Sequence, residues 1–312
     1  MLKLKIINNG FYIVIIFAVI YFSLAAKYFL SIENFFSMLH SLSPVVVISL
    51  GMALVILMGK IDISVGSIAF LSVTIGVLLI TKYEMNYYLV FSIIIIIGMI
   101  LGAINGFFIV ILKINPLITT LGTMFTFRGI SLQLTNASVI NLPDSLRAIG
   151  NLSIGPVFID TIIMIIFLYI LHSLHLNTTF GRHVNAIGSK SLIANTLGIN
   201  ENKITFICFV LSGLLASVGG ILSLLQVGLL SGYLGQGLEF TAVAVVVVGG
   251  ISLFGGRGKI IPGVLAGAFV FELVRNGLNQ IGANPYAYKL ITGIIIFVAM
   301  YADALKKDMK TN

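Results

Sequence analysis

Long apolar runs constrain this chain more than any other feature of its sequence. A helix needs about 20 mostly apolar residues to cross roughly 30 Å of hydrocarbon, and the 312-residue chain offers ten runs of this kind. Only 9% of its residues are charged, whereas a soluble domain carries about 25%. Lipid must therefore surround most of the protein. The runs are residues 10–30, 43–59, 63–81, 87–112, 116–135, 156–175, 204–226, 238–254, 260–279 and 286–303.

The predicted fold is an all-α polytopic membrane protein, in which residues 1–312 form one transmembrane domain with about ten transmembrane helices. Ten crossings use about 200 residues, which leaves no room for a separate soluble domain. The eighth run is short and ends in Gly249-Gly250, so we expect a broken helix there. This composition excludes a cytosolic enzyme and, with Cys208 as the one cysteine, a secreted disulfide scaffold.

The placement of Lys and Arg predicts the orientation. With a cytoplasmic N-terminus and ten crossings, twelve of these residues fall inside and four outside, as the positive-inside rule requires. Both termini are then cytoplasmic. The net charge of +8 therefore reflects topology, and we expect no nucleic-acid partner.

The longest polar interruption, residues 176–203, lies on the cytoplasmic side in this topology. Residues 189–195, followed by Gly198, predict a short helix with a glycine stop. Such a helix either rests on lipid headgroups or inserts its apolar face into a groove of a soluble partner, and the residues alone leave both open. The apolar face comprises Ala186, Ile187, Leu192, Ile193, Leu197 and Ile199.

A glycine-rich stretch, GGISLFGGRGK at 249–259, follows the eighth run on the same side. It lacks the G-x-x-x-x-G-K-[ST] spacing of a phosphate-binding loop, so we interpret it as a tight turn between closely packed helices. Any ATPase that drives this protein is then on another chain. The turn residues singled out are Gly249, Gly250, Gly255, Gly256, Arg257 and Gly258.

Polar residues within the apolar runs are candidates for a translocation path. Glu272 and Arg275, three residues apart on one helix face, can satisfy each other. The alternative role for each such residue is interhelical contact. Asp62 is expected at a helix start, with Lys60 close enough in sequence to pair with it. The candidates are Asn105, Asn115, Thr119, Arg128, Glu239, Glu272, Arg275 and Asn276.

No catalytic or metal-binding group is predicted. His172 and His175 lack a nearby carboxylate or cysteine, which favours an interfacial role over metal binding. An intramembrane hydrolase would need a nucleophile with a base, and no such arrangement is present in the sequence. These residues also leave open a secondary transporter, in which Glu239 or Glu272 binds a coupling ion.

Several segments together resemble the permease subunits of ABC importers for ribose and similar sugars, a family that includes the autoinducer-2 importer. The similarity covers nearly the whole chain, and the run from 239 to 259 is the most specific part. The matching segments are GMALVILMGKIDISVGS (51–67), INGFFIVILKINPLITTLGTMFTFRGI (104–130), GRHVNAIGSKSLIANTLGIN (181–200), FVLSGLLASVGGIL (209–222) and LEFTAVAVVVVGGISLFGGRGKIIPGVLAGAF (238–269).

This resemblance implies a transport subunit that moves a ribose-like monosaccharide or related furanosyl compound inward across a bacterial inner membrane by alternating access. The implied partners are a cytoplasmic ATPase that binds ATP and Mg, a second permease subunit, identical or different, and an extracytoplasmic sugar-binding protein. No cofactor is implied on this chain. Residues 181–200 resemble the family's coupling loop, and the residues expected to contact the ATPase are Gly181, Arg182, Ala186, Ile187, Gly188, Leu192, Ala194, Gly198 and Ile199.

Overall fold

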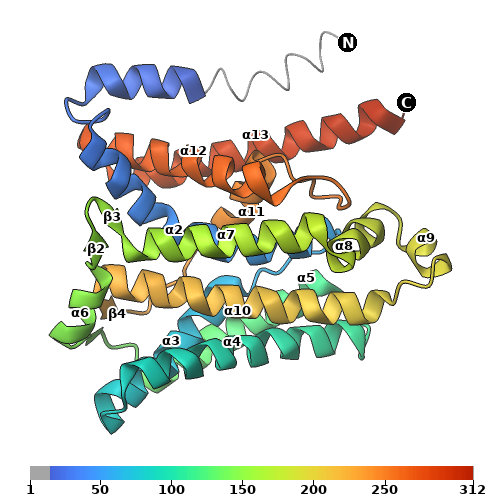
Figure 1. Cartoon of the computed structure of the whole chain (residues 1–312), viewed down its shortest axis with the longest axis horizontal. Coiled ribbons are helices and arrows are strands. Elements are labelled where there is room, and N and C mark those ends of the chain that lie inside the picture. The colour runs from blue at the N-terminus through green and yellow to red at the C-terminus, as the bar shows by residue number, and fades with distance from the viewer. Residues whose placement is uncertain (1–14, 312) are drawn as a thin grey trace.

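The computed structural model describes residues 15–311, and nearly all of its regular structure is helical (Figure 1). A short apolar helix covers Ile15–Ala25. Two small antiparallel pairs join β1 (Ile140–Asn141) to β4 (Leu229–Leu230) and β2 (Ser153–Ile154) to β3 (Val157–Phe158). The remaining helices are α2 (Ile32–Leu57), α3 (Val65–Tyr83), α4 (Tyr87–Val110), α5 (Pro116–Thr135), α6 (Asp144–Gly150), α7 (Ile159–Asn177), α8 (Thr179–Ser189), α9 (Ser191–Thr196), α10 (Glu201–Val227), α11 (Leu238–Val248), α12 (Ile260–Gln280) and α13 (Pro285–Thr311).

Within residues 15–311, seven helices are long and apolar enough to cross a membrane: α2, α3, α4, α7, α10, α12 and α13. The predicted polytopic, mainly helical membrane protein is therefore confirmed. The predicted count of about ten transmembrane helices is not confirmed, because the parts of three runs that the structure describes form helices that are too short or too polar.

Each of those three runs falls short for its own reason. The run 10–30 begins outside the described residues, and its described helix spans only Ile15–Ala25. The helix of the run 116–135, α5, carries five threonines and Arg128, which lower its hydropathy. The eleven residues of α11 extend about 16 Å at 1.5 Å per residue, half of the hydrocarbon thickness. α11 ends at Val248, immediately before Gly249, where the sequence predicts a break.

Helix α10 lies at the centre of the bundle and packs against α2, α3 and α4. Small residues bring these helices together. A Cβ on Gly213 of α10 would overlap the carbonyl oxygen of Gly98 on α4, and a Cβ on Gly51 of α2 would lie 2.9 Å from the Cα of Ser212. Without a hydrophobic driving force between helices in lipid, such close approach provides the van der Waals contact that holds them together.

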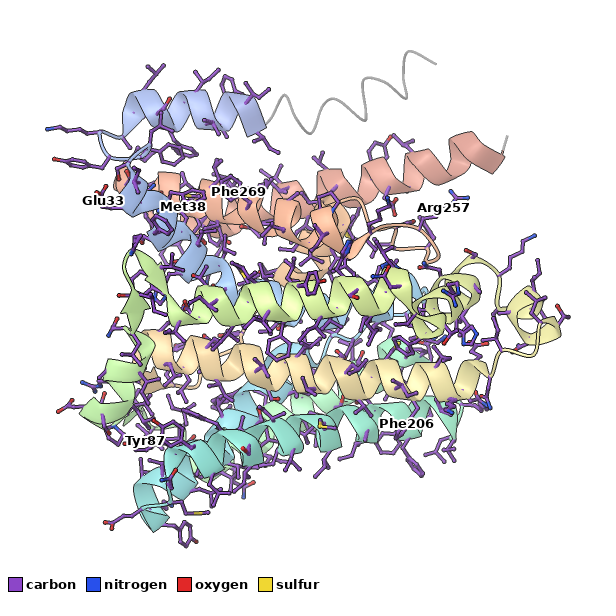
Figure 2. All side chains as sticks on the ribbon, viewed as in Figure 1. Glu33, Met38, Tyr87, Phe206, Arg257 and Phe269 are labelled. Carbon is purple, nitrogen blue, oxygen red and sulfur yellow. The ribbon has the colours of Figure 1, made fainter. Side chains whose placement is uncertain are left out.

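The two ends of the bundle differ. Figure 1 shows α8, α9 and the C-terminal end of α13 at one end, and α6, β2 and β3 at the other. We call these the α9 end and the α6 end. Figure 2 places Arg257 towards the α9 end, and Glu33 and Tyr87 towards the α6 end. The predicted helix at 189–195 is found in a modified form, since Lys190 adopts extended backbone and separates α8 from α9.

Candidate coupling surface and translocation path

Helix α8 is held inside the fold, although the sequence places it in a polar loop. Its first turn begins where the Thr178 hydroxyl accepts a hydrogen bond from the Gly181 N–H at 3.4 Å. Gly181 itself lies directly on the backbone of His175, where a Cβ would overlap. Ile187 is 3% exposed and packs in the main hydrophobic core. Helix α8 therefore belongs to the body of the helical bundle.

Helix α9 turns its apolar side chains outward. Leu192 is 83% exposed and Leu197 is 71% exposed, whereas Ala194 is 1% exposed and anchors the turn against the core. Gly198 has a φ of +75° that ends the element, and the Ile199 N–H donates to the Ala194 carbonyl at 3.1 Å. The result is a short apolar projection, which we call the α9 tip: Leu192, Ile193 and Leu197.

The structure thus divides the nine predicted coupling residues. Leu192, Arg182 and Gly198 are exposed and accessible to a partner, while Ala186, Gly188 and Ile199 are partly buried and Gly181, Ile187 and Ala194 are buried. Ile193 and Leu197 belong to the exposed surface but were not among the nine. Both residues belong to the apolar face that the sequence predicts, and this pattern could have identified them as contact residues. The break at Lys190 determines which part of that face points outward.

A contact among glycines connects α8 to the end of α2 and to the turn between α11 and α12. The Gly256 N–H donates to the Leu57 carbonyl at 2.8 Å. A Cβ on Gly188 would overlap that same carbonyl oxygen, and one on Gly255 would lie 2.6 Å from the Gly59 nitrogen. We call Gly59, Gly188, Gly255 and Gly256 the glycine junction. Backbones meet there without side chains between them.

The glycine-rich stretch 249–259 forms a tight turn, consistent with its interpretation from sequence. The Ser252 N–H donates to the Arg257 carbonyl at 3.0 Å, and Gly250 and Gly258 take φ values of +90° and +134°. A Cβ on Gly249 would overlap the carbonyl oxygen of Gly263 on α12. The Asp303 carboxylate of α13 accepts from the Leu253 N–H at 3.0 Å. This turn therefore fixes α11 to α12 and α13, and leaves the Arg257 side chain exposed.

Asp62 organises a buried polar network just inside the glycine junction. Its carboxylate accepts hydrogen bonds from the hydroxyls of Ser64 at 2.6 Å and Ser212 at 2.8 Å. Asn105 donates to the Ser64 hydroxyl and accepts from the Thr123 hydroxyl, both at 2.7 Å. The expectation of a contact with Lys60 is wrong, because the Lys60 ammonium lies 3.0 Å from the Glu201 carboxylate instead.

Arg128 and Glu239 come together from α5 and the start of α11. The Arg128 guanidinium donates to the Gly232 and Leu234 carbonyls at 3.1 and 3.4 Å and lies over the Phe70 ring at 5.3 Å. It also interacts electrostatically with Glu239, which is buried and accepts from the Gly237 N–H at 3.2 Å. This second group holds the loop before α11 against α5.

The third group lies on α12. The Arg275 guanidinium is 2.7 Å from the Glu272 carboxylate, with the side chains 39% and 8% exposed. One helical turn after Glu272, Asn276 exchanges two hydrogen bonds with Asn34 of α2, at 2.8 and 3.0 Å. Glu272 and Arg275 border a cavity of about 530 Å³ between α2, α11, α12 and α13.

The remaining path candidates have local roles. The Asn115 side chain caps α5 by accepting from the Leu117 N–H at 2.9 Å, and the buried Thr119 hydroxyl has no partner within the described residues. His172 and His175 bond to different groups, the Ile261 N–H and the Asn185 amide oxygen. The eight candidates therefore do not form one continuous lining within this chain.

Comparison with known proteins identifies the family. The ribose import permease RbsC of Escherichia coli K12 is 33% identical over 288 residues, which cover 89% of this chain and 88% of RbsC. The autoinducer 2 import permease LsrC of Photorhabdus luminescens is 33% identical over 309 residues, covering 96% and 92% of the two chains. The galactose/methyl galactoside import permease MglC of Escherichia coli K12 is 31% identical over 325 residues, covering 97% and 96%.

No solved structure matches this chain. The family described as the permease component of the branched-chain amino acid transport system matches residues 34–300. Together with seven helices able to cross a membrane, these matches show that the chain belongs to this permease family, as a multi-pass inner-membrane transport subunit and not an enzyme.

Proposed function

We propose that this chain is the membrane permease subunit of an ATP-driven importer for a sugar. The family description names branched-chain amino acids, whereas the three relatives above, each aligned over most of its length, are named for import of ribose, autoinducer 2 and galactose or methyl galactoside. The full-length similarity to these importers favours a monosaccharide or related furanosyl compound as the solute.

The observation that carries the coupling mechanism is the α9 tip. Leu192 and Leu197 are largely exposed on a helix that polar residues anchor. The Ser191 hydroxyl bonds to the Glu201 carboxylate, which also pairs with Lys60. Burying a leucine side chain in a partner stabilises the complex by roughly 1.5–3 kcal/mol, and a helix that inserts its apolar face into a groove is a recurring mode of recognition. A cytoplasmic ATPase supplies that groove in our proposal.

A push on the α9 tip would reach the membrane through the glycine junction. Gly188 of α8 contacts the end of α2 and the turn between α11 and α12, so movement of α8 must displace both. In this mechanism ATP and Mg bind to the partner ATPase, which supplies the difference in affinity that drives the switch between two states. A second permease subunit completes the pathway, an extracytoplasmic binding protein delivers the sugar, and both termini lie in the cytoplasm.

The rival function, a secondary transporter with a coupling ion, is less well supported. An acid that binds a coupling ion must be free to exchange it. Glu272 is paired with Arg275 at 2.7 Å, and Glu239 interacts with Arg128. Both acids therefore have a fixed cationic neighbour that competes with an added ion.

Two substitutions at the α9 tip test the docking. In Leu192→Asp and Leu197→Asp, a charge replaces the apolar contact, and we expect the ATPase that co-purifies with the permease to fall at least about tenfold, the effect of losing an interface hot spot. Asn195→Asp is the matched control, because it adds the same charge at an exposed polar position of the same helix. Because all three positions are exposed, the melting temperature of the permease should not change. ATPase binding that survives both leucine substitutions would exclude docking at α9.

A further inference from the structure

The cavity between α2, α11, α12 and α13 contrasts with the close packing elsewhere in the bundle. Its volume of about 530 Å³ lies within the 300–1,000 Å³ typical of small-molecule sites. It forms where α11 begins partway along the bundle, so the chain leaves the space beyond Gly237 unfilled by that helix. The short eighth helix thus produces a space of the right size for a small solute.

Part of the cavity lining is polar and offers both donors and acceptors. Glu272 is an acceptor and Arg275 a donor, and their pairing leaves lone pairs and N–H groups for a further ligand. Gln236 and Thr241 from the start of α11 and Tyr288 of α13 also border the space.

The rest of the lining is largely apolar and aromatic, with Phe271, Phe240, Leu42 and Ile296 among its residues. A sugar ring presents the matching surface, since its hydroxyls are both donors and acceptors and its C–H faces are apolar. Hydroxyl groups need partners of both kinds, which a Glu-Arg pair beside an amide provides.

The charges of the cavity disfavour an anionic ligand such as a lipid phosphate. The Glu272 carboxylate is a buried wall residue, and it occupies the nearer cation, Arg275. Glu272 also lies eight residues before the end of α12, about 12 Å along the helix, so the carboxylate is set back from that helix end. The one cation without a carboxylate partner at this cavity among the described residues is Lys289, which is exposed.

We infer that this cavity is a transient binding site for a neutral monosaccharide, in which the Glu272–Arg275 pair, Gln236, Thr241 and Tyr288 bond to the hydroxyls and Phe240 and Phe271 contact the ring. This inference rests on the proposed sugar-import function. It places the solute within one subunit. It also makes α11 the element whose movement would open or close the site, because the turn at 249–258 connects α11 to the glycine junction.

Cysteine protection tests the cavity without any need for the ATPase. Cys208 is fully buried and stays unreactive, so Thr241→Cys adds one reactive thiol at the cavity of the purified full-length permease. We expect saturating ribose or galactose to slow its reaction with a polar maleimide, whereas leucine should not. Leu152→Cys at the α6 end, which is exposed and distant in sequence from the cavity, should react at the same rate with or without sugar.

Transport kinetics provide the second measurement, with the permease, ATPase and binding protein in proteoliposomes. Glu272→Gln should raise the KM for sugar about tenfold or more, because a site built for hydrogen bonds loses a paired acceptor. Leu152→Cys, which lies outside the cavity lining, is the matched control and should keep the KM and the uptake rate of the wild type.

Each contrary result overturns a different statement. The cavity would be excluded as a sugar site if labelling rates were equal with and without each sugar and the KM were unchanged. ATP-driven uptake in the same preparation would still support the import function. Protection by leucine alone would exclude the sugar class. Protection by added phosphatidylglycerol alone would make the cavity a lipid site. Protection by sugar in a permease that shows no ATP-driven uptake would uphold the site and overturn the importer mechanism.

Discussion

The glycine junction and the cavity are two regions where helices of this permease are interrupted, and they are built in opposite ways. At the junction, the ends of α2 and α8 and the turn that follows α11 approach until even a methyl group would overlap backbone atoms. At the cavity, α11 starts late and a space of about 530 Å³ remains beside Glu272 and Arg275. Both regions depend on α11, the short helix whose N-terminus borders the cavity and whose C-terminal turn lies in the junction.

This difference shows how one short helix, α11, can contribute both to a closely packed contact and to an open cavity. Close-packed interiors have low compressibility and transmit strain, so a junction of bare backbones passes a displacement on instead of absorbing it. A solute needs room and hydrogen-bonding groups in place of close packing. Substitutions at the two regions should therefore differ in size of effect, with the largest where there is no space.

Gly188→Ala should have the largest effect. Its Cβ would overlap the Leu57 carbonyl oxygen and approach the Gly256 nitrogen to 2.5 Å, and neither is the flexible end of a side chain. We expect a loss of about 3 kcal/mol of stability or more, measured by thermal unfolding in detergent. Gly122→Ala, within α5 and with no atom near its Cβ position, should instead be neutral or stabilising by up to about 1 kcal/mol. Similar melting curves for the two variants would show that the junction is not tightly packed.

Asp62→Ala should have the next largest effect. The substitution leaves the Ser64 and Ser212 hydroxyls without their buried acceptor, and each buried unsatisfied donor costs about 1–3 kcal/mol. Asp62→Asn keeps one oxygen acceptor and should lose less. The unfolding free energies of both variants in detergent check this order. If alanine were tolerated as well as asparagine, the network would not stabilise the fold.

The smallest effects should be at the cavity, and they should be unequal. Arg275→Gln leaves the Glu272 carboxylate, 8% exposed, without its counter-ion, and we expect a loss of about 1–3 kcal/mol. Glu272→Gln leaves Arg275, which is 39% exposed and so less enclosed by the protein than Glu272, and less than about 1 kcal/mol should be lost. Thermal unfolding of the two single variants and the double variant measures the asymmetry. Equal losses would mean that the two side chains are equally shielded from water.

Much of the coupling region could be predicted from sequence, but its orientation could not. The apolar positions around 186–199 and the glycine stop at Gly198 are local patterns, and both are found in the structure. The extended Lys190 divides this segment, so that Ile187 packs inward and Leu192 points outward. An aspartate at position 187 would therefore disrupt the core as well as any docking, and Leu197 is the better position for a test.

The path candidates show the limit of prediction from composition. The rarity of polar residues in apolar runs singled out Asn105, Arg128 and Glu272 as path candidates, and each has polar partners in the structure. The partners of Asn105 and Arg128 lie on other helices or loops, at separations from 18 to 106 residues. Sequence patterns record neighbours within a helix, such as Arg275 beside Glu272, and do not record contacts across the bundle.

The sequence by itself determined that this chain is a helical membrane protein, because apolar runs leave no other way to satisfy backbone groups in lipid. It also determined the helix stops at glycine and the pair on α12, since these depend on residues within one or two turns. Tertiary structure alone decided that α11 is too short to cross, that Asp62 bonds to Ser212 and not to Lys60, and that a cavity remains beside Glu272. Those outcomes depend on how closely whole helices approach one another. Small residues on segments that are distant in sequence together determine that distance.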